Sequence, residues 1–382
     1  MHSYVIGATG SGKSNYLLSE MEGAFCFLDK HGTTARQIAD AMPCVYWRPA
    51  DLDYPIGFNP LARCDPDQRW KRTADLVSIF ADIWKLGPET PRLLYYLRSS
   101  VRLLLDTPGT TIPDIRRVLS DEPFRARLVR KCSDRECQAT WTEFSHKDAK
   151  QQATEIDSLQ NKVAALADPL PLRYVLGQPT SSIDIAKILE RGTPLVIDLS
   201  DLGDEPAALL GAIAINAFKQ AAEASRTPAD YRLFIDEFQN FGTSTIATIL
   251  SEARKWRLSL TLAHQFISQL DEQIIDAVLG NCGTIISFRV GANDAPIIGK
   301  AIDWNPDNLM ELGLGQARCR TLVNGKPTSA YLMQTEKVEL PTGWLEKNIR
   351  NTRANYARAR KDVEYALSGE KRREWARREK SW

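Results

Sequence analysis

The chain opens with the run HSYVI at residues 2–6 and continues with a glycine-rich segment, residues 7–14. The apolar run predicts a short strand, and residues 15–21 predict a helix. A G-x-x-x-x-G-K-S segment between a strand and a helix is typical of a phosphate-binding loop, because its backbone N–H groups surround an anion at a helix N-terminus. We expect the whole segment to bind a nucleotide, through Gly7, Ala8, Thr9, Gly10, Ser11, Gly12, Lys13 and Ser14. Lys13 would reach the β- and γ-phosphates, and the Ser14 hydroxyl would bind Mg²⁺.

A second apolar run, YRLFI at residues 231–235, ends in Asp236 and Glu237. A buried parallel strand that delivers an acid at its carboxyl end places that acid beside the phosphate-binding loop of the neighbouring strand. Asp236 would then hold the metal through water, and Glu237 would act as the general base for an attacking water molecule. Two solvated acids at a strand end are the alternative interpretation.

Further short apolar runs alternate with helical patterns, which predicts an α/β fold with a mostly parallel sheet covered on both faces. These strand candidates are residues 24–28, 44–47, 194–199, 258–263 and 284–290. The long interruption between them lacks a strand pattern and contains helical runs at 68–86, 91–106 and 140–167. We expect a nucleotide-binding core of residues 1–61 and 179–338, an inserted all-helical subdomain of residues 62–178, and a basic C-terminal helical segment, 339–382.

Composition excludes several classes of protein. A chain of 382 residues with 43% hydrophobic and 25% charged residues is typical of a globular protein. The apolar run 207–218 is too short to cross a membrane, and seven scattered cysteines indicate a reducing compartment, so a cytoplasmic location is expected.

Charge is distributed unevenly. The net charge is +1, but residues 350–382 contain eleven Lys or Arg against five Asp or Glu. Trp375 and Trp382 lie among those charges. Basic residues mixed with aromatic ones could bind DNA phosphates and bases, and a solvated helix with internal ion pairs is the alternative.

Two more side chains could respond to hydrolysis. Residues 243–257 predict a helix with an apolar face formed by Ile246, Ile249, Leu250 and Ala253, and Arg254 lies at the margin of that face, where it could reach a neighbouring subunit. Gln265 follows the next strand and could sense the γ-phosphate. For an isolated Arg or Gln, a solvated position is the more common interpretation.

Several longer segments resemble one family. Residues 7–14 are joined by FLDKHG at 27–32, PIGFNPL at 55–61, IDEFQNF at 235–241, ILSEARK at 249–255, LAHQ at 262–265, GNCGT at 280–284 and FRVG at 288–291. Together they resemble the conjugative DNA-transfer coupling ATPases, the TraG/TraD-like members of the HerA/FtsK superfamily of P-loop motor proteins. The resemblance extends over residues 1 to about 335.

The resemblance implies a RecA-like P-loop NTPase fold and a homo-hexameric ring that hydrolyses ATP with Mg²⁺ at subunit interfaces and moves single- or double-stranded DNA through a channel. Lys13 and Ser14 match the Walker A residues, and Asp236 and Glu237 match the Walker B pair. Gln265 matches the sensor glutamine and Arg254 the arginine finger, with Arg289 as a second candidate for contact in trans. Asp29 and His31 match a sequence block that lies near the nucleotide in this family. A plain turn at the end of the strand explains these two residues equally well.

Coupling proteins of this kind usually carry membrane helices or another N-terminal module before the ATPase, whereas six residues precede Gly7 here. The resemblance therefore leaves two expectations: a stand-alone motor, or one held at the inner membrane by a partner such as a secretion-channel component or a relaxase. Three other functions stay open: a HerA-type defence or repair motor working with a nuclease, an assembly ATPase of a secretion machine that does not thread DNA, and a nucleotide-gated binding module with little turnover.

Overall fold

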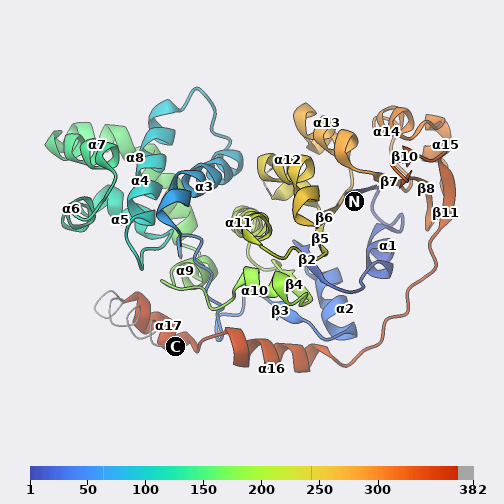
Figure 1. The fold of residues 1–382 in the computed structure, drawn as a ribbon, viewed down its shortest axis with the longest axis horizontal. Helices are drawn as coiled ribbons and strands as arrows, with labels where there is room; N and C mark the ends of the chain where they lie inside the picture. The colour runs from blue at the N-terminus through green and yellow to red at the C-terminus, as the bar shows by residue number, and fades with distance from the viewer. Residues whose placement is uncertain (63, 242, 369–382) are drawn as a thin grey trace. The chain divides into compact units, whose positions relative to one another are not determined.

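The computed structural model of the chain describes residues 1–62, 64–241 and 243–368 (Figure 1). These residues form two compact units, each of which we describe by itself. Unit 1 comprises Met1–Arg48, Ile185–Ser200 and Ala214–Thr352, and unit 2 comprises Pro49–Asp184, Asp201–Ile213 and the chain from Arg353.

Unit 1 is built on a nine-stranded sheet with the strand order β11-β8-β7-β1-β6-β5-β2-β4-β3. The strands are β1 (Ser3–Ile6), β2 (Phe25–Asp29), β3 (Val45–Trp47), β4 (Leu195–Asp198), β5 (Tyr231–Asp236), β6 (Leu258–His264), β7 (Thr284–Ser287), β8 (Gln316–Arg320) and β11 (Tyr331–Gln334). The first seven run parallel, which confirms the predicted mostly parallel sheet, and β8 and β11 extend it in antiparallel pairing. Two short strands, β9 (Leu322–Val323) and β10 (Lys326–Pro327), form a separate hairpin.

One detail of strand order differs from the sequence-based prediction. The acid-bearing strand β5 is not the direct neighbour of β1, because β6 lies between them with Ile6 paired to His264 and Asp236 paired to Ala263. The carboxyl ends of β1, β6 and β5 nevertheless lie at the same edge of the sheet, since the three strands are parallel. The acids of β5 therefore reach the loop after β1 across one intervening strand.

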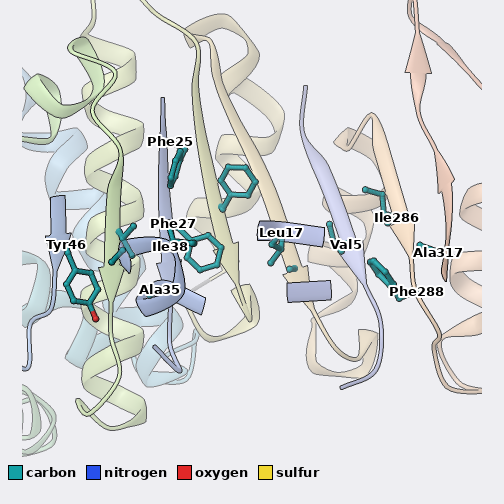
Figure 2. Close-up of a cluster of buried hydrophobic side chains, with 14 of the residues drawn as sticks. Val5, Leu17, Phe25, Phe27, Ala35, Ile38, Tyr46, Ile286, Phe288 and Ala317 are labelled. Carbon is teal, nitrogen blue, oxygen red and sulfur yellow. The ribbon is translucent and has the colours of Figure 1, made fainter. Parts of the chain in front are cut away.

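One hydrophobic core of unit 1 covers one face of this sheet. Figure 2 shows Leu17 of α1 (Lys13–Ser19) and Ala35 and Ile38 of α2 (Thr33–Ala41) over strand residues that include Val5 and Phe27. The side chains in this cluster are almost completely removed from solvent. Burying each large apolar side chain contributes roughly 1.5–3 kcal/mol, so this face holds α1, and with it the loop before α1, in place.

The remaining helical segments of unit 1 connect the strands or, in the case of α16, follow the last of them. They are α10 (Ile185–Glu190), the part of α11 (Asp204–Ala224) that belongs to this unit, α12 (Thr243–Glu252), α13 (Glu272–Asn281), α14 (Ala295–Ile302), α15 (Pro306–Met310), most of α16 (Leu345–Tyr356), and the 3₁₀ turns η2 (Phe238–Asn240), η3 (Ala253–Trp256) and η4 (Ile267–Gln269). In α12 the predicted apolar residues Ile246, Ile249 and Leu250 are buried. The α-helix ends at Glu252 rather than continuing to residue 257, because η3 and a positive φ of 56° at Arg257 turn the chain into β6.

Unit 2 is helical. Its helical segments are η1 (Pro66–Gln68), α3 (Arg69–Trp84), α4 (Pro91–Leu105), α5 (Asp114–Ser120), α6 (Glu122–Val129), α7 (Arg135–His146), α8 (Ala149–Ala167), α9 (Leu170–Leu176) and α17 (Arg360–Leu367), together with the first turns of α11. Residues 64–178 contain no strand, as expected for an all-helical insertion, whose bounds stay a prediction.

The predicted helical run 140–167 is two helices. Asp148 accepts a hydrogen bond from the Gln151 N–H and so starts α8 afresh after α7 ends. Residues 49–61 and 201–213 belong to the helical unit, whereas the sequence-based prediction placed them in the nucleotide-binding core. The domain boundaries expected from the sequence stay a prediction.

In the described part of the chain, no helix is both long and apolar enough to cross a membrane. Of the basic segment expected at residues 339–382, the last part, residues 369–382 with Trp375 and Trp382, lies outside the described residues.

Candidate nucleotide-binding site

Lys13 begins α1 directly after the glycine-rich loop. Its side chain is buried, with 7% exposed, and its ammonium group donates a 2.6 Å hydrogen bond to the carbonyl of Gly7. Burial lowers the pKa of Lys13, and the nearby carboxylates of Glu237 and Asp236 oppose that shift. The ammonium group of Lys13 therefore lies at the opening of the loop. A phosphate bound there would replace the Gly7 carbonyl as the hydrogen-bond acceptor of this group.

The loop itself depends on close approaches that only glycine permits. A Cβ at Gly7 would lie 2.5 Å from the Phe288 Cβ. Gly12 has a φ of 119°, and a Cβ there would lie 3.1 Å from the Cα of Gly315. Ser11 is buried and its Oγ has no hydrogen-bond partner among the described residues. An unpaired buried hydroxyl inside this loop fits a phosphate oxygen, because a buried polar atom without a partner is costly.

Asp236 and Glu237 close the other side of the site, both less than one-tenth exposed. Burial, followed by the charges of Asp29 and Glu237, raises the pKa of Asp236 to about 7, while Lys13 acts in the opposite direction. A divalent cation beside this carboxylate would favour its ionised form. Ser14 is exposed at the start of α1, so a hydroxyl and a carboxylate, both oxygen donors suited to Mg²⁺, flank Lys13.

Gln265 joins the two sides through hydrogen bonds. Thr9 of the loop donates its hydroxyl to Gln265 Oε1 at 2.6 Å, and Gln265 Nε2 donates to Glu237 Oε1 at 2.6 Å. His264, one residue earlier, is buried, and its Nε2 lies 2.5 Å from the Tyr4 hydroxyl. Burial lowers the pKa of His264 to about 3. The strand end that carries Gln265 is therefore held by a neutral, fully buried histidine.

Asp29 and His31 are the pair for which the sequence leaves open a place near the nucleotide or a plain turn. The Asp29 carboxylate accepts hydrogen bonds from the backbone N–H groups of His31 and Ala35, at 2.8 and 2.9 Å. Asp29 thus stabilises the turn into α2, and its charge acts on Asp236. His31 is exposed.

The two candidate arginines for contact in trans differ in what the structure describes. The backbone of Arg254 lies in η3, and its side chain is outside the described residues. Arg289 is exposed, and its carbonyl accepts a 2.8 Å hydrogen bond from the N–H of Ala8, in the phosphate-binding loop of the same subunit. Their roles as residues acting on a neighbouring subunit stay predictions.

Sequence reasoning missed the segment that supports the loop from the other side. The carbonyl of Ser11 accepts a hydrogen bond from the Gly315 N–H at 3.0 Å, and Asn15 bonds the backbone of Glu336 and Val338. Only the pattern Gly313-Leu314-Gly315 before β8 signalled a tight approach.

A parallel sheet with a glycine-rich loop after β1, a lysine at the start of the following helix and two acids after β5 defines the class of this protein: a P-loop NTPase fold.

The comparisons with known proteins narrow that class. Residues 230–298, from the start of β5 into α14, match the family model described as the TraM recognition site of TraD and TraG. No curated protein sequence matches the chain.

Among solved structures, the chain is similar to the bacterial conjugative coupling protein TrwBdeltaN70 in its unbound monoclinic form, with a TM-score of 0.66 and 16% identity over 89% of this chain and 87% of that one. It is also similar to plasmid coupling protein TrwB in complex with ADP and Mg²⁺, with a TM-score of 0.64 and 16% identity over 89% and 86%. The similarity to VirB4 of Thermoanaerobacter pseudethanolicus has a TM-score of 0.61 and 14% identity over 88% and 90%. These structural similarities confirm the predicted fold, and the family-model match agrees with the resemblance to TraD and TraG over residues 230–298.

Proposed function

We propose that this protein is an ATPase that binds ATP with Mg²⁺ and uses its hydrolysis to move DNA in conjugative or type IV secretion-like transfer. The observation that carries the ATPase proposal is the convergence of Lys13, Asp236, Glu237 and Gln265 at one edge of the sheet, linked from loop to base by hydrogen bonds. The structure of TrwB in complex with ADP and Mg²⁺, which shares this fold, supports the same choice of nucleotide and metal.

Each residue has a distinct task in this proposal. The backbone of residues 7–14 and Lys13 bind the phosphates, and Ser14 and Asp236 hold Mg²⁺, which neutralises charge on the phosphates when bound. Glu237 accepts a proton from a water molecule as that water attacks the γ-phosphorus. Gln265, bonded to both Thr9 and Glu237, is placed to respond to the γ-phosphate.

The DNA-moving part of the proposal rests on the resemblance to coupling proteins. It includes a homo-hexamer in which Arg254 or Arg289 contacts the nucleotide of a neighbouring subunit, and a relaxase or channel component as partner at the inner membrane. A finger charge supplied in this way contributes about 10³ to 10⁵ in rate, so the protein alone at low concentration should be nearly inactive.

The test is ATP turnover with and without single- or double-stranded DNA at low salt, using the wild type and Glu237→Gln. We expect DNA to raise the wild-type rate, and Glu237→Gln to bind ATP but lose turnover. A rate that no DNA changes would contradict DNA translocation and favour a secretion-assembly ATPase. Hydrolysis that survives in Glu237→Gln would contradict the assignment of the base.

Electron microscopy of Glu237→Gln with ATP and DNA tests the ring. A six-fold ring with density in its channel is the expected result. A monomer under these conditions would contradict contact in trans by Arg254 and Arg289.

A further inference from the structure

Glu237 is held by two carboxamides. Gln265 Nε2 donates to Glu237 Oε1 at 2.6 Å, and Gln239 Nε2 donates to Glu237 Oε2 at 2.8 Å. Gln265 is the sensor expected from the sequence, whereas Gln239 has no role in the function proposed above. Both oxygens of the proposed base are therefore fixed in direction, one of them by an unassigned residue.

The backbone of Glu237 is constrained as well. Its φ of 52° places a non-glycine residue in the left-handed region, a conformation that costs about 1–3 kcal/mol and persists only where neighbours enforce it. The Asn240 side chain donates to the Glu237 carbonyl at 2.8 Å, and Lys30 donates to Asn240 Oδ1 at 3.0 Å. Lys30 and Asn240 thus fix the main chain, which leaves the carboxylate to Gln239 and Gln265.

The contacts of Gln239 point to Glu237 rather than to the fold. Gln239 lies in η2, a 3₁₀ turn of three residues, and is only partly buried. Among the described residues, the Gln239 side chain makes one hydrogen bond, to Glu237, and its Oε1 is buried without a partner. Keeping a buried acceptor unpaired has a cost, which the bond to a charged carboxylate offsets.

We propose that Gln239 is a positioning residue for the hydrolytic reaction: it holds Glu237 Oε2 while Gln265 exchanges its bonds between Glu237, Thr9 and the γ-phosphate. This inference rests on the proposed ATPase function. The two N–H donors of Gln265 Nε2 have fixed directions, so a movement of this amide toward the phosphate shifts its bond to Glu237 as well. Gln239, whose side chain among the described residues is hydrogen-bonded to Glu237 and not to the loop, keeps the direction of the carboxylate fixed during that exchange.

The test is Gln239→Met, which retains the length of the side chain and removes its donor. We expect kcat to fall about tenfold, the loss of one hydrogen bond to a charged group, with KM for ATP and the affinity for ADP unchanged. The matched control is Gln269→Met, at an exposed position in η4, another three-residue 3₁₀ turn of unit 1, which should leave kcat unchanged.

A second background separates positioning from a structural role. Single-turnover hydrolysis of radiolabelled ATP is measured in Glu237→Gln with and without Gln239→Met. If Gln239 acts through Glu237, the second substitution has no further effect on the residual rate. An equal tenfold fall in both backgrounds, a rise in KM, or an unchanged kcat in the wild-type background would overturn the proposal. Failure of the ATPase function itself would look different, because wild type and Glu237→Gln would then hydrolyse ATP equally.

Discussion

The nucleotide edge of unit 1 and the interior of unit 2 both bury polar groups, but they satisfy them differently. In unit 2, buried Asn59 donates to the carbonyls of Thr110 and Pro179, and buried Asp114 accepts from the backbone and hydroxyl of Thr111. At the nucleotide edge, Lys13 takes a carbonyl of its own loop, Asp236 has its pKa raised by burial and by neighbouring acids, and Ser11 Oγ has no partner among the described residues.

The difference separates polar groups that hold a fold from those that await a ligand. A backbone carbonyl or an N–H group that belongs to the same turn satisfies a buried polar side chain permanently. Several ionisable groups lie close together at the nucleotide edge without such complete pairing, which raises the free energy of the protein without its ligand. A charged ligand that pairs with these groups lowers that free energy. We therefore expect substitutions in unit 2 to change stability, and substitutions at the nucleotide edge to change binding and rate.

The largest effect on stability should come from Trp141→Ala in unit 2. Trp141 is fully buried in α7 and packs on Tyr96 and Phe144 at ring distances of 5.8 and 5.5 Å. Its removal should lower the free energy of unfolding by about 3–5 kcal/mol, measured by urea denaturation, without changing ADP affinity. Trp70→Ala, at a position 73% exposed in α3, is the control and should cost less than about 0.5 kcal/mol. Weaker ADP binding by folded Trp141→Ala would break the contrast between the two regions.

Lys13→Ala should have the opposite profile. We expect a loss of about 10²- to 10³-fold in ATP turnover, because a fixed charge beside the transferring phosphoryl group is removed. Stability without nucleotide should not fall, since burial disfavours the ammonium. Steady-state hydrolysis and urea denaturation measure the two effects, and the exposed Lys300→Ala in α14 serves as the control. A large stability loss in Lys13→Ala would show that its charge mainly supports the fold.

Gly12→Ala tests whether close approach shapes the loop. A side chain at φ 119° costs about 1–3 kcal/mol, and the new Cβ would press on Gly315. We expect weaker ADP binding, measured by calorimetry. Gly23→Ala is matched, because Gly23 also has a positive φ, of 73°, but open space around it. Equal ADP affinity in the two variants would rule out the Gly315 contact as a determinant of the loop.

The smallest effect is a pH dependence from buried His264. Its pKa is lowered to about 3, so between pH 6.5 and 3 the unfolded chain binds a proton there that the folded chain does not. Stability from this group is complete above pH 6.5 and is lost as pH falls, by about 1.4 kcal/mol per pH unit. Urea denaturation at pH 6.5 and 5.5 should show that His264→Gln loses less stability over this interval than the wild type. Exposed His146→Gln in unit 2 should behave like the wild type, and an equal pH slope in all three would disprove the assignment.

Local patterns predicted much of unit 1 because its central strands are short, apolar and bounded by punctuating residues. The pattern of residues 2–14 and the run 231–237 located the loop and the acids. β8 and β11 escaped prediction, since QARCR and YLMQ bury only alternate or few side chains and carry polar residues. Residues 140–167 were predicted as a single helix, because the periodicity of apolar residues does not reveal a capping residue such as Asp148 inside the run.

The sequence by itself determined the chemistry available: a loop able to surround phosphates, a lysine, two acids and a glutamine, each at the end of a predicted strand or the start of a helix. Only the tertiary structure decided which of these groups meet. The order of parallel strands put β6 between β1 and β5, and this is why Gln265 can bond both Thr9 and Glu237. Periodicity within a strand carries no information about its neighbours, so the contacts of Gly315 with the loop and of Gln265 with Glu237 arise from the packing of segments that no local pattern connects.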